Sequence, residues 1–171
     1  MAVAHKLACL LPDKISAIVA ISGGHQFNSQ GHCKSSIPVP ILQIHGTEDC
    51  IWPYNGELAS CSNNKKQKGS LVSVQQTMKD WVKTNSCQDQ QPSVEIINNL
   101  EDDTEVEINR WNQCQKPVSL YKVNNGGHFW PSGYKPRADK VGSLSAEIGN
   151  YEIWEFLSSG QSFESQPNNN K

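Results

Sequence analysis

An acidic residue and a histidine occupy matching positions in two segments of this 171-residue sequence. Asp49 follows the apolar segment VPILQIHG, and His128 follows PVSLYKVN, with two glycines directly before it. A carboxylate beside an imidazole holds one ring tautomer and stabilises the imidazolium, which suits a histidine to act as a general base. Each residue alone also has a structural interpretation, in a turn or a cap. Together, at corresponding strand ends, they are better explained as a catalytic pair.

A serine hydroxyl is the group that such a pair would activate. Acid before histidine is the chain order of the α/β-hydrolases, in which the serine comes first, in a G-x-S-x-G turn. No G-x-S-x-G occurs in these 171 residues. Ser22, in ISGGH, lacks the first glycine and the helix that should follow directly. The sequence therefore predicts a general base and its orienting acid without their nucleophile.

Apolar, β-branched segments predict the strands that position this pair. Residues 14–24 (KISAIVAISGG) and 39–46 (VPILQIHG) are almost wholly apolar, as in parallel strands buried on both faces. SVEII and TEVEINRW alternate like a half-exposed hairpin, and PVSLYKVN is a further strand. Residues beyond the carboxyl ends of neighbouring strands meet at one edge of an α/β sheet. We therefore expect Asp49 and His128 to lie within hydrogen-bond distance.

Three segments predict helices. Residues 1–11 place apolar side chains at helical spacing and stop at Pro12. Residues 73–85 (SVQQTMKDWVKTN) are amphipathic, and Ser73 and Gln76 have the spacing of a capping box. The stripe expected on the last helix comprises Leu144, Ile148, Tyr151, Trp154 and Leu157. The order helix, strand, strand, helix, hairpin, strand, helix predicts an α/β fold.

The composition argues against several classes of partner. The formal net charge is -2, and KKQK is the only local concentration of basic residues, so no nucleic-acid partner is expected. No apolar segment approaches membrane-spanning length, and no signal peptide is visible. A metal site of His25, His32, Cys33 and Cys50 fits no common ligand spacing. We predict no metal and no cofactor.

Cysteine and tryptophan residues leave further questions open. Six cysteines, an even number, favour disulfides and an oxidising compartment, but they allow 15 pairings. Trp52 and Trp130 follow Asp49 and His128 closely, and they either pack in the interior or form an apolar wall for an acyl or aromatic group. His45, on a buried strand, is interpreted as a core or loop-supporting residue.

Four segments resemble parts of one family. They are MAVAHKLACLLPDKISAIVAISGG, PVPILQIHGTEDCIWPYNG, SVQQTMKDWVKTNSC and VSLYKVNNGGHFWPSG. They resemble, in order, the segment after the nucleophile, the acid loop, a helix ending in cysteine and the histidine loop. The family is the esterase and polyhydroxybutyrate (PHB) depolymerase group of α/β-hydrolases, which includes feruloyl-esterase-like and acetylxylan-esterase-like proteins. One difference is Ser86, where the family has glycine.

The resemblance implies the C-terminal half of an α/β-hydrolase fold over residues 1–158, followed by a polar tail, 159–171, that we expect to be disordered. The nucleophilic serine would fall a few residues before Met1, and the oxyanion-hole donors would also lie upstream. The resemblance further implies a disulfide between Cys87 and Cys114, worth on the order of 3 kcal/mol. It leaves the pairing of Cys9, Cys33, Cys50 and Cys61 open.

The expected function is that of a secreted carboxylic-ester hydrolase whose substrate is a polyester or a plant cell-wall ester. Without a nucleophile and an oxyanion hole, the 171 residues alone should be inactive. Self-association is expected because the strand within residues 14–24 would have an unpaired edge. The alternative is a non-catalytic module, derived from such a hydrolase, that binds a polysaccharide or polyester through Trp52 and Trp130. An in-frame G-x-S-x-G-G upstream of the Met1 codon would favour the enzyme, and a genuine start signal with no upstream match would favour the module.

Overall fold

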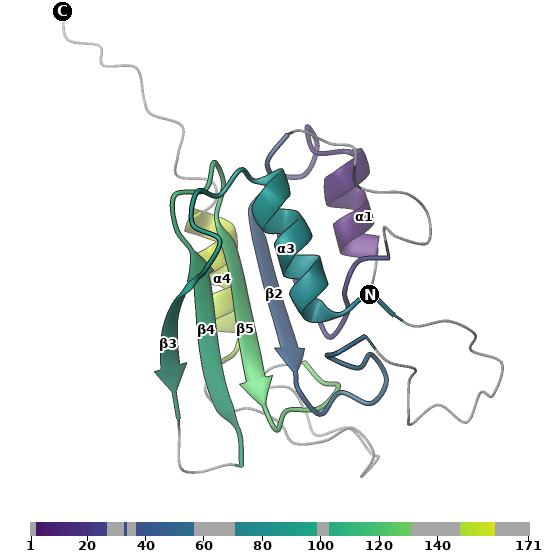
Figure 1. Ribbon diagram of the computed structural model, residues 1–171, viewed down its shortest axis with the longest axis vertical. Coiled ribbons are helices and arrows are strands. Elements are labelled where there is room, and N and C mark those ends of the chain that lie inside the picture. The colour runs from purple at the N-terminus through teal and green to yellow at the C-terminus, as the bar shows by residue number, and fades with distance from the viewer. Residues whose placement is uncertain are drawn as a thin grey trace, which may run out of the picture.

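The computed structural model describes residues 3–26, 33, 37–56, 71–98, 103–130 and 148–159. In these residues five strands form one mixed sheet, and three helices pack against it. Helices α1 and α3 cover one face of the sheet, and α4 covers the other (Figure 1). The predicted order of elements and the predicted α/β class are confirmed.

The strand order in the sheet is β1-β2-β5-β4-β3. The strands are β1 (Ile18–Ile21), β2 (Ile41–Gly46), β3 (Ser93–Ile97), β4 (Glu105–Trp111) and β5 (Val118–Asn124). Strands β1, β2 and β5 are parallel, whereas β3 and β4 form an antiparallel hairpin joined to β5. Because β2 and β5 are parallel neighbours, the loops that follow them begin side by side. These are the loops that carry Asp49 and His128.

The helices are α1 (Val3–Leu10), α3 (Val74–Thr84) and α4 (Asn150–Ser159). Helix α3 begins with the predicted cap, in which Ser73 Oγ accepts a hydrogen bond from the Gln76 backbone N–H at 3.1 Å. The reciprocal hydrogen bond of a capping box, from the Ser73 backbone N–H to the Gln76 side chain, is not formed in the described residues; the Gln76 amide nitrogen donates to Asp80 Oδ1 at 2.9 Å.

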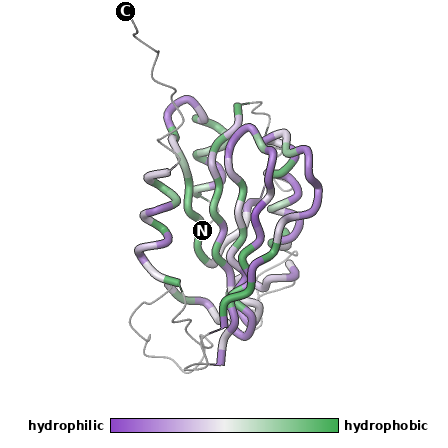
Figure 2. Tube along the Cα trace, turned by 90° about the vertical axis from the view of Figure 1, so that its left-hand side faces the viewer, coloured by the Kyte–Doolittle hydropathy of each residue, from purple (hydrophilic) through white to green (hydrophobic). Residues whose placement is uncertain are grey.

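The core has two layers, one on each face of the sheet. Side chains on β2 alternate between them, because successive residues of a strand point to opposite faces. Ile41 packs in the layer with α1 and α3, whereas Leu42 and Ile44 pack in the layer with α4. All six residues of β2 are buried, as predicted for a central parallel strand. Figure 2 shows the apolar positions gathered along the strands between the helices.

Two predictions of burial were wrong. In β1, Ile18 and Ala20 are buried but Val19 and Ile21 are only partly so, because β1 is the outer strand of the sheet in the described residues. In α4, the predicted stripe residues Tyr151 and Trp154 are 66% and 68% exposed. The helix packs through Ile153 and Phe156 and through Leu157, which was predicted to be buried; their spacing of three and four residues places them on one face. Helix α4 starts only at Asn150, so the buried Ile148 precedes it, and Leu144 lies outside the described residues.

Gly46 ends β2 at the point where the acid loop and the histidine loop come together. A Cβ atom there would overlap the carbonyl oxygens of Gly126 and Gly127. Two backbone hydrogen bonds join the loops, from the Thr47 N–H to Val123 O at 2.9 Å and from the Glu48 N–H to Gly126 O at 2.8 Å. The absence of a side chain at Gly46 therefore allows the two loops to make direct backbone contact.

We predict that Gly46→Ala lowers the free energy of unfolding by about 1 to 3 kcal/mol, the usual cost of overpacking a protein interior. Urea unfolding followed by circular dichroism measures this change. Gly24→Ala is the matched control, because its Cβ would meet first the side-chain hydroxyl of Thr77, at 2.9 Å, whereas the Cβ at position 46 would overlap a backbone oxygen. Equal stability of the two variants would contradict the close approach of the loops.

Candidate active site

The structure places the predicted acid and histidine in direct contact. The Nδ1 atom of His128 lies 2.9 Å from Oδ2 of Asp49 and donates a hydrogen bond to it. The Asp49 side chain is fully buried, whereas the His128 side chain is 33% exposed. The other ring nitrogen, Nε2, makes no hydrogen bond to the described residues. An imidazole held at Nδ1 and open at Nε2 has the geometry of a general base.

Four donors surround the Asp49 carboxylate. Oδ1 accepts the backbone N–H groups of Ile51 at 2.9 Å and Trp52 at 2.8 Å. Oδ2 lies 3.2 Å from Nε2 of His45, in addition to its bond with His128. Burial alone would raise the pKa of Asp49, but the hydrogen bonds from His128, His45 and Trp52 outweigh it and hold the pKa well below its usual range. The carboxylate is therefore ionised at neutral pH.

The histidine loop turns at Asn125 rather than at the glycines. Asn125 has a φ of 61°, in the left-handed region, and its backbone N–H donates to Thr47 Oγ1 at 2.9 Å. Gly126, the next residue, does not have a positive φ. Its role is one of space, because a Cβ there would lie 2.6 Å from the side chain of Val123.

Ser22 supports the histidine loop. It follows β1 directly and has a φ of 51°, and its hydroxyl donates to the backbone oxygen of Phe129 at 3.3 Å. No helix follows Ser22 directly, and the residue is only 5% exposed. The strand-end position of Ser22 was visible in the sequence, but its contact with the histidine loop was not.

The two tryptophans lie in different environments. Trp52 is partly buried, and its buried Nε1 has no hydrogen-bond partner among the described residues. Trp130 is 53% exposed, and its Nε1 donates to Asn150 Oδ1 at 2.9 Å, at the start of α4. An apolar substrate wall formed by these side chains stays a prediction.

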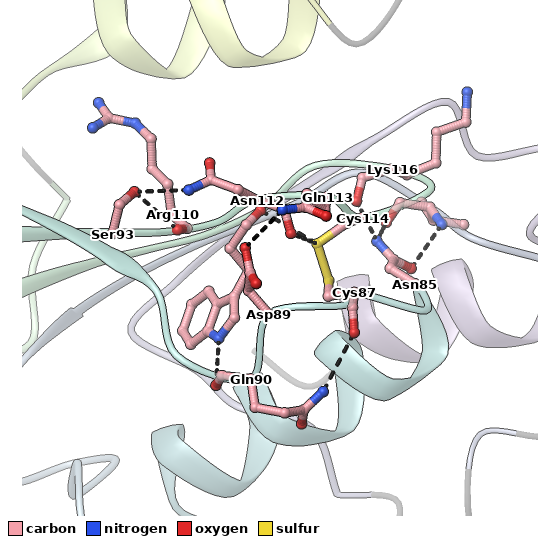
Figure 3. The surroundings of a disulfide bond; sticks show 12 residues. Asn85, Cys87, Asp89, Gln90, Ser93, Arg110, Asn112, Gln113, Cys114 and Lys116 are labelled. Atoms are coloured by element: carbon pink, nitrogen blue, oxygen red, sulfur yellow. Dashed lines mark hydrogen bonds between the residues drawn. A yellow bond between two sulfur atoms is a disulfide. The ribbon is translucent and has the colours of Figure 1, made fainter.

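Cys87 and Cys114 are joined in a disulfide (Figure 3). The bond links the end of α3 to the segment just before β5, on either side of the β3–β4 hairpin. Asn85, the C-cap of α3, donates from Nδ2 to Val39 O at 2.8 Å and to Lys116 O at 3.1 Å, so it fastens the helix end to the approaches of β2 and β5.

The φ of Ser86 is 51°, a conformation that favours glycine at the end of a helix. This finding gives a physical reason for the glycine that the resembling family has at this position.

A second disulfide joins Cys9 and Cys33, and Cys50 is also disulfide-bonded. Cys61 and His32 lie outside the described residues. The sulfur atoms of Cys33 and Cys50 are therefore not free to bind a metal as thiolates. No cluster of three or more potential metal ligands occurs in the described part of the chain. The disulfides are consistent with an extracellular location.

None of the described helices has the length and apolar character needed to cross a membrane.

Comparison with known proteins supports an esterase-like relationship. No family model matches the chain. A stretch of 124 residues, 70% of the chain, is 29% identical to feruloyl esterase B from Piromyces equi. The matched stretch covers 21% of that protein, so the chain corresponds to about a fifth of its relative's length. The fold and site are those of an α/β protein with an aspartate–histidine pair at the carboxyl edge of its parallel strands.

Proposed function

We propose that this chain provides the acid–base pair of a carboxylic-ester hydrolase of the PHB depolymerase and feruloyl esterase type. The observation that carries the proposal is the 2.9 Å contact between His128 Nδ1 and the buried Asp49 carboxylate. The similarity to feruloyl esterase B supports the choice of ester chemistry. The complete hydrolase includes a serine outside these 171 residues, in a G-x-S-x-G turn that this sequence lacks.

In the proposed reaction, the serine oxygen attacks the ester carbonyl while His128 Nε2 accepts its proton. The carbonyl oxygen becomes an oxyanion, stabilised by N–H donors outside this chain, and the imidazolium is stabilised by Asp49. His128 then protonates the leaving alcohol, and the acyl group remains on the serine. Water, deprotonated by the same nitrogen, releases the carboxylic acid and restores the serine.

The proposed substrates are esters of plant cell walls or of an aliphatic polyester, met outside the cell. The name of the relative favours a feruloyl ester, which has an aromatic acyl group. Trp52 and Trp130 are the proposed apolar contacts for this group, because they follow the acid and the histidine along the two loops.

The test uses the protein encoded by the whole reading frame that contains this sequence. We expect it to hydrolyse methyl ferulate or 4-nitrophenyl acetate and to react with a fluorophosphonate, which labels activated serines. Mass spectrometry should find the label on a serine outside residues 1–171. Ser22→Ala should keep most of the activity, because the Ser22 hydroxyl is bonded to Phe129 O. Labelling of Ser22, or the absence of both hydrolysis and labelling, would contradict the proposal.

A binding module is the second candidate, and exposed aromatic side chains favour it. Trp130, Tyr151 and Trp154 are each more than half exposed, at 53%, 66% and 68%, and the hydrogen bond from Trp130 to Asn150 brings the histidine loop to the start of α4. Aromatic faces of this kind suit flat polymer surfaces. Retention on insoluble xylan or PHB that is lost in Trp130→Ala and Trp154→Ala, without any hydrolysis, would favour the module over the enzyme.

A further inference from the structure

Buried polar side chains form a continuous hydrogen-bonded row from helix α3 to the acid loop. In order, the members of this polar row are Trp81, His5, Gln43, His45 and Asp49, and none is more than 2% exposed. The successive contacts are 3.0 Å from Trp81 Nε1 to His5 Nδ1, 3.1 Å from His5 Nε2 to Gln43 Oε1, 3.2 Å from Gln43 Nε2 to His45 Nδ1 and 3.2 Å from His45 Nε2 to Asp49 Oδ2. Polar groups in an apolar core are costly unless each one has a partner, and here each one has.

The two ends of the polar row determine the direction of its hydrogen bonds. The indole N–H of Trp81 can only donate, and the ionised carboxylate of Asp49 can only accept. His5 must therefore accept at Nδ1 and carry its proton on Nε2. Gln43 turns its oxygen toward His5 and its amide nitrogen toward His45. His45 in turn accepts at Nδ1 and donates from Nε2.

Backbone carbonyls give an independent indication of the same direction. A carbonyl oxygen can only accept, so the side-chain atom that faces it must be a donor. The pairs are His5 Nε2 with Gly23 O at 3.2 Å, Gln43 Nε2 with Ile44 O at 3.3 Å and His45 Nε2 with Trp52 O at 2.8 Å. All three agree with the assignment made from the ends of the row.

His5 is not protonated at neutral pH, so the hydrogen bonds of the polar row are kept there. Burial lowers the pKa of His5 to about 4. The hydrogen bond to Gly23 O acts in the opposite direction, and the adjacent His25 lowers the pKa further. His5 therefore stays neutral, with one ring nitrogen free to accept from the indole.

The outer end of the polar row meets the acid–base pair at a single atom. Asp49 Oδ2 accepts from His128 Nδ1 and lies 3.2 Å from His45 Nε2, which shares its one N–H between this oxygen and Trp52 O, while Oδ1 accepts two backbone N–H groups. Each carboxylate oxygen thus has two donors, and rotation of the group would break all four contacts. Without the His45 donor, Oδ2 would be held by His128 alone.

We propose that His45 is a positioning residue for the Asp49–His128 pair, held in its Nε2–H tautomer by Gln43, His5 and Trp81. The effect on turnover rests on the proposed hydrolase function, whereas the tautomer and the orientation of the carboxylate do not. His45 acts through Asp49 and touches no substrate.

Nitrogen NMR on histidine-labelled protein from the whole reading frame tests the tautomer. At pH 7, correlation spectra should show His45 protonated on Nε2 and unprotonated on Nδ1. They should also show a distinct proton signal for His128 Nδ1–H, because the fixed carboxylate protects it from exchange with water. A His45 ring that is protonated on Nδ1, or that averages between the tautomers, would overturn the assignment.

Two variants of His45 test the positioning role. His45→Leu fills the space without a donor, whereas His45→Gln places an amide N–H near the position of Nε2. We expect His45→Leu to broaden or remove the His128 Nδ1–H signal and to lower kcat by about 10- to 100-fold, the size of effect that a misplaced catalytic group produces. The KM should stay within about twofold, because the site is disturbed where proton transfer occurs. His45→Gln should restore the signal and most of the lost turnover.

Gln43→Met provides the test if His45→Leu does not fold. It keeps His45 in place and removes the donor to its Nδ1, so the ring loses one of its anchors. We expect an intermediate loss of turnover and partial broadening of the His128 signal. A sharp, unchanged His128 signal in both His45→Leu and Gln43→Met, or in whichever of them folds, would overturn the positioning role. If neither the parent nor any variant hydrolyses esters, but the His128 Nδ1–H signal changes as expected, the proposed function is contradicted and the positioning role is not.

Discussion

Replacing His128 with alanine in the complete hydrolase is expected to lower kcat by about four to six orders of magnitude, as loss of a member of the triad does in serine hydrolases. The reason is that Nε2 of His128 is the atom that accepts the serine proton, while Nδ1 is hydrogen-bonded to Asp49. Asp49→Asn should have an effect of similar size. The amide would turn an N–H toward one of the four donors that now face the carboxylate, and the imidazole could no longer hold its proton on Nδ1.

Steady-state hydrolysis of 4-nitrophenyl acetate measures both effects, and thermal unfolding shows whether each variant is folded. His128→Ala should keep the melting temperature of the parent within a few degrees, because the ring is partly exposed. Asp49→Asn should melt earlier, since it leaves a buried donor without an acceptor. A folded His128→Ala protein with more than a tenth of the parent's kcat would remove His128 from the proposed mechanism.

Acid should destabilise the protein by about 3 kcal/mol between pH 6.5 and pH 4 through His5 alone. Burial holds the pKa of His5 at about 4, below the ordinary value of 6.5. The unfolded chain takes up this proton as the pH falls through 6.5, but the folded protein does so only near pH 4. The stability associated with neutral His5 is therefore complete above pH 6.5 and declines down to pH 4. The lowered pKa of Asp49 acts in the same direction only below its ordinary value of 3.8.

Urea unfolding at a series of pH values measures this loss, and His5→Gln is the control. The glutamine amide can donate toward Gln43, but it does not titrate. Its free energy of unfolding should change less than that of the parent from pH 6.5 to pH 4. His25, which packs edge-on against His5 and pairs with Asp80, remains in both proteins, so the difference between the two curves reports the titration of His5 together with its interaction with His25. Parallel curves would show that His5 titrates normally in the folded state.

The acid and histidine loops could be located from the sequence because their signal is local. Each follows a short apolar segment, and parallel neighbours necessarily bring such loops to one edge. The cap of α3 was predictable for the same reason, since Ser73 and the Gln76 backbone are three residues apart.

The polar row could not be predicted, because its partners are distant in the chain. Gln43 and His45 stand out as polar positions on the same face of an apolar strand, but nothing local connects them with His5 or with Trp81. The hydrogen bond from Trp81 to His5 spans 76 residues. The exposed face of α4 was mispredicted for a related reason. Tyr151 and Trp154 are apolar enough to suggest burial, and only the packing of Ile153 against the sheet determines which face turns inward.

The disulfide between Cys87 and Cys114 has a consequence for how proteins with this fold can diverge. It closes the β3–β4 segment at its base, with a separation of 27 residues between the two cysteines. The entropy of closing a loop grows only with the logarithm of its length, so doubling this segment would cost about 0.6 kcal/mol. Insertions and deletions between the cysteines should therefore accumulate over evolution with little effect on the carboxyl edge of β2 and β5. Related proteins are expected to differ most in length at this hairpin.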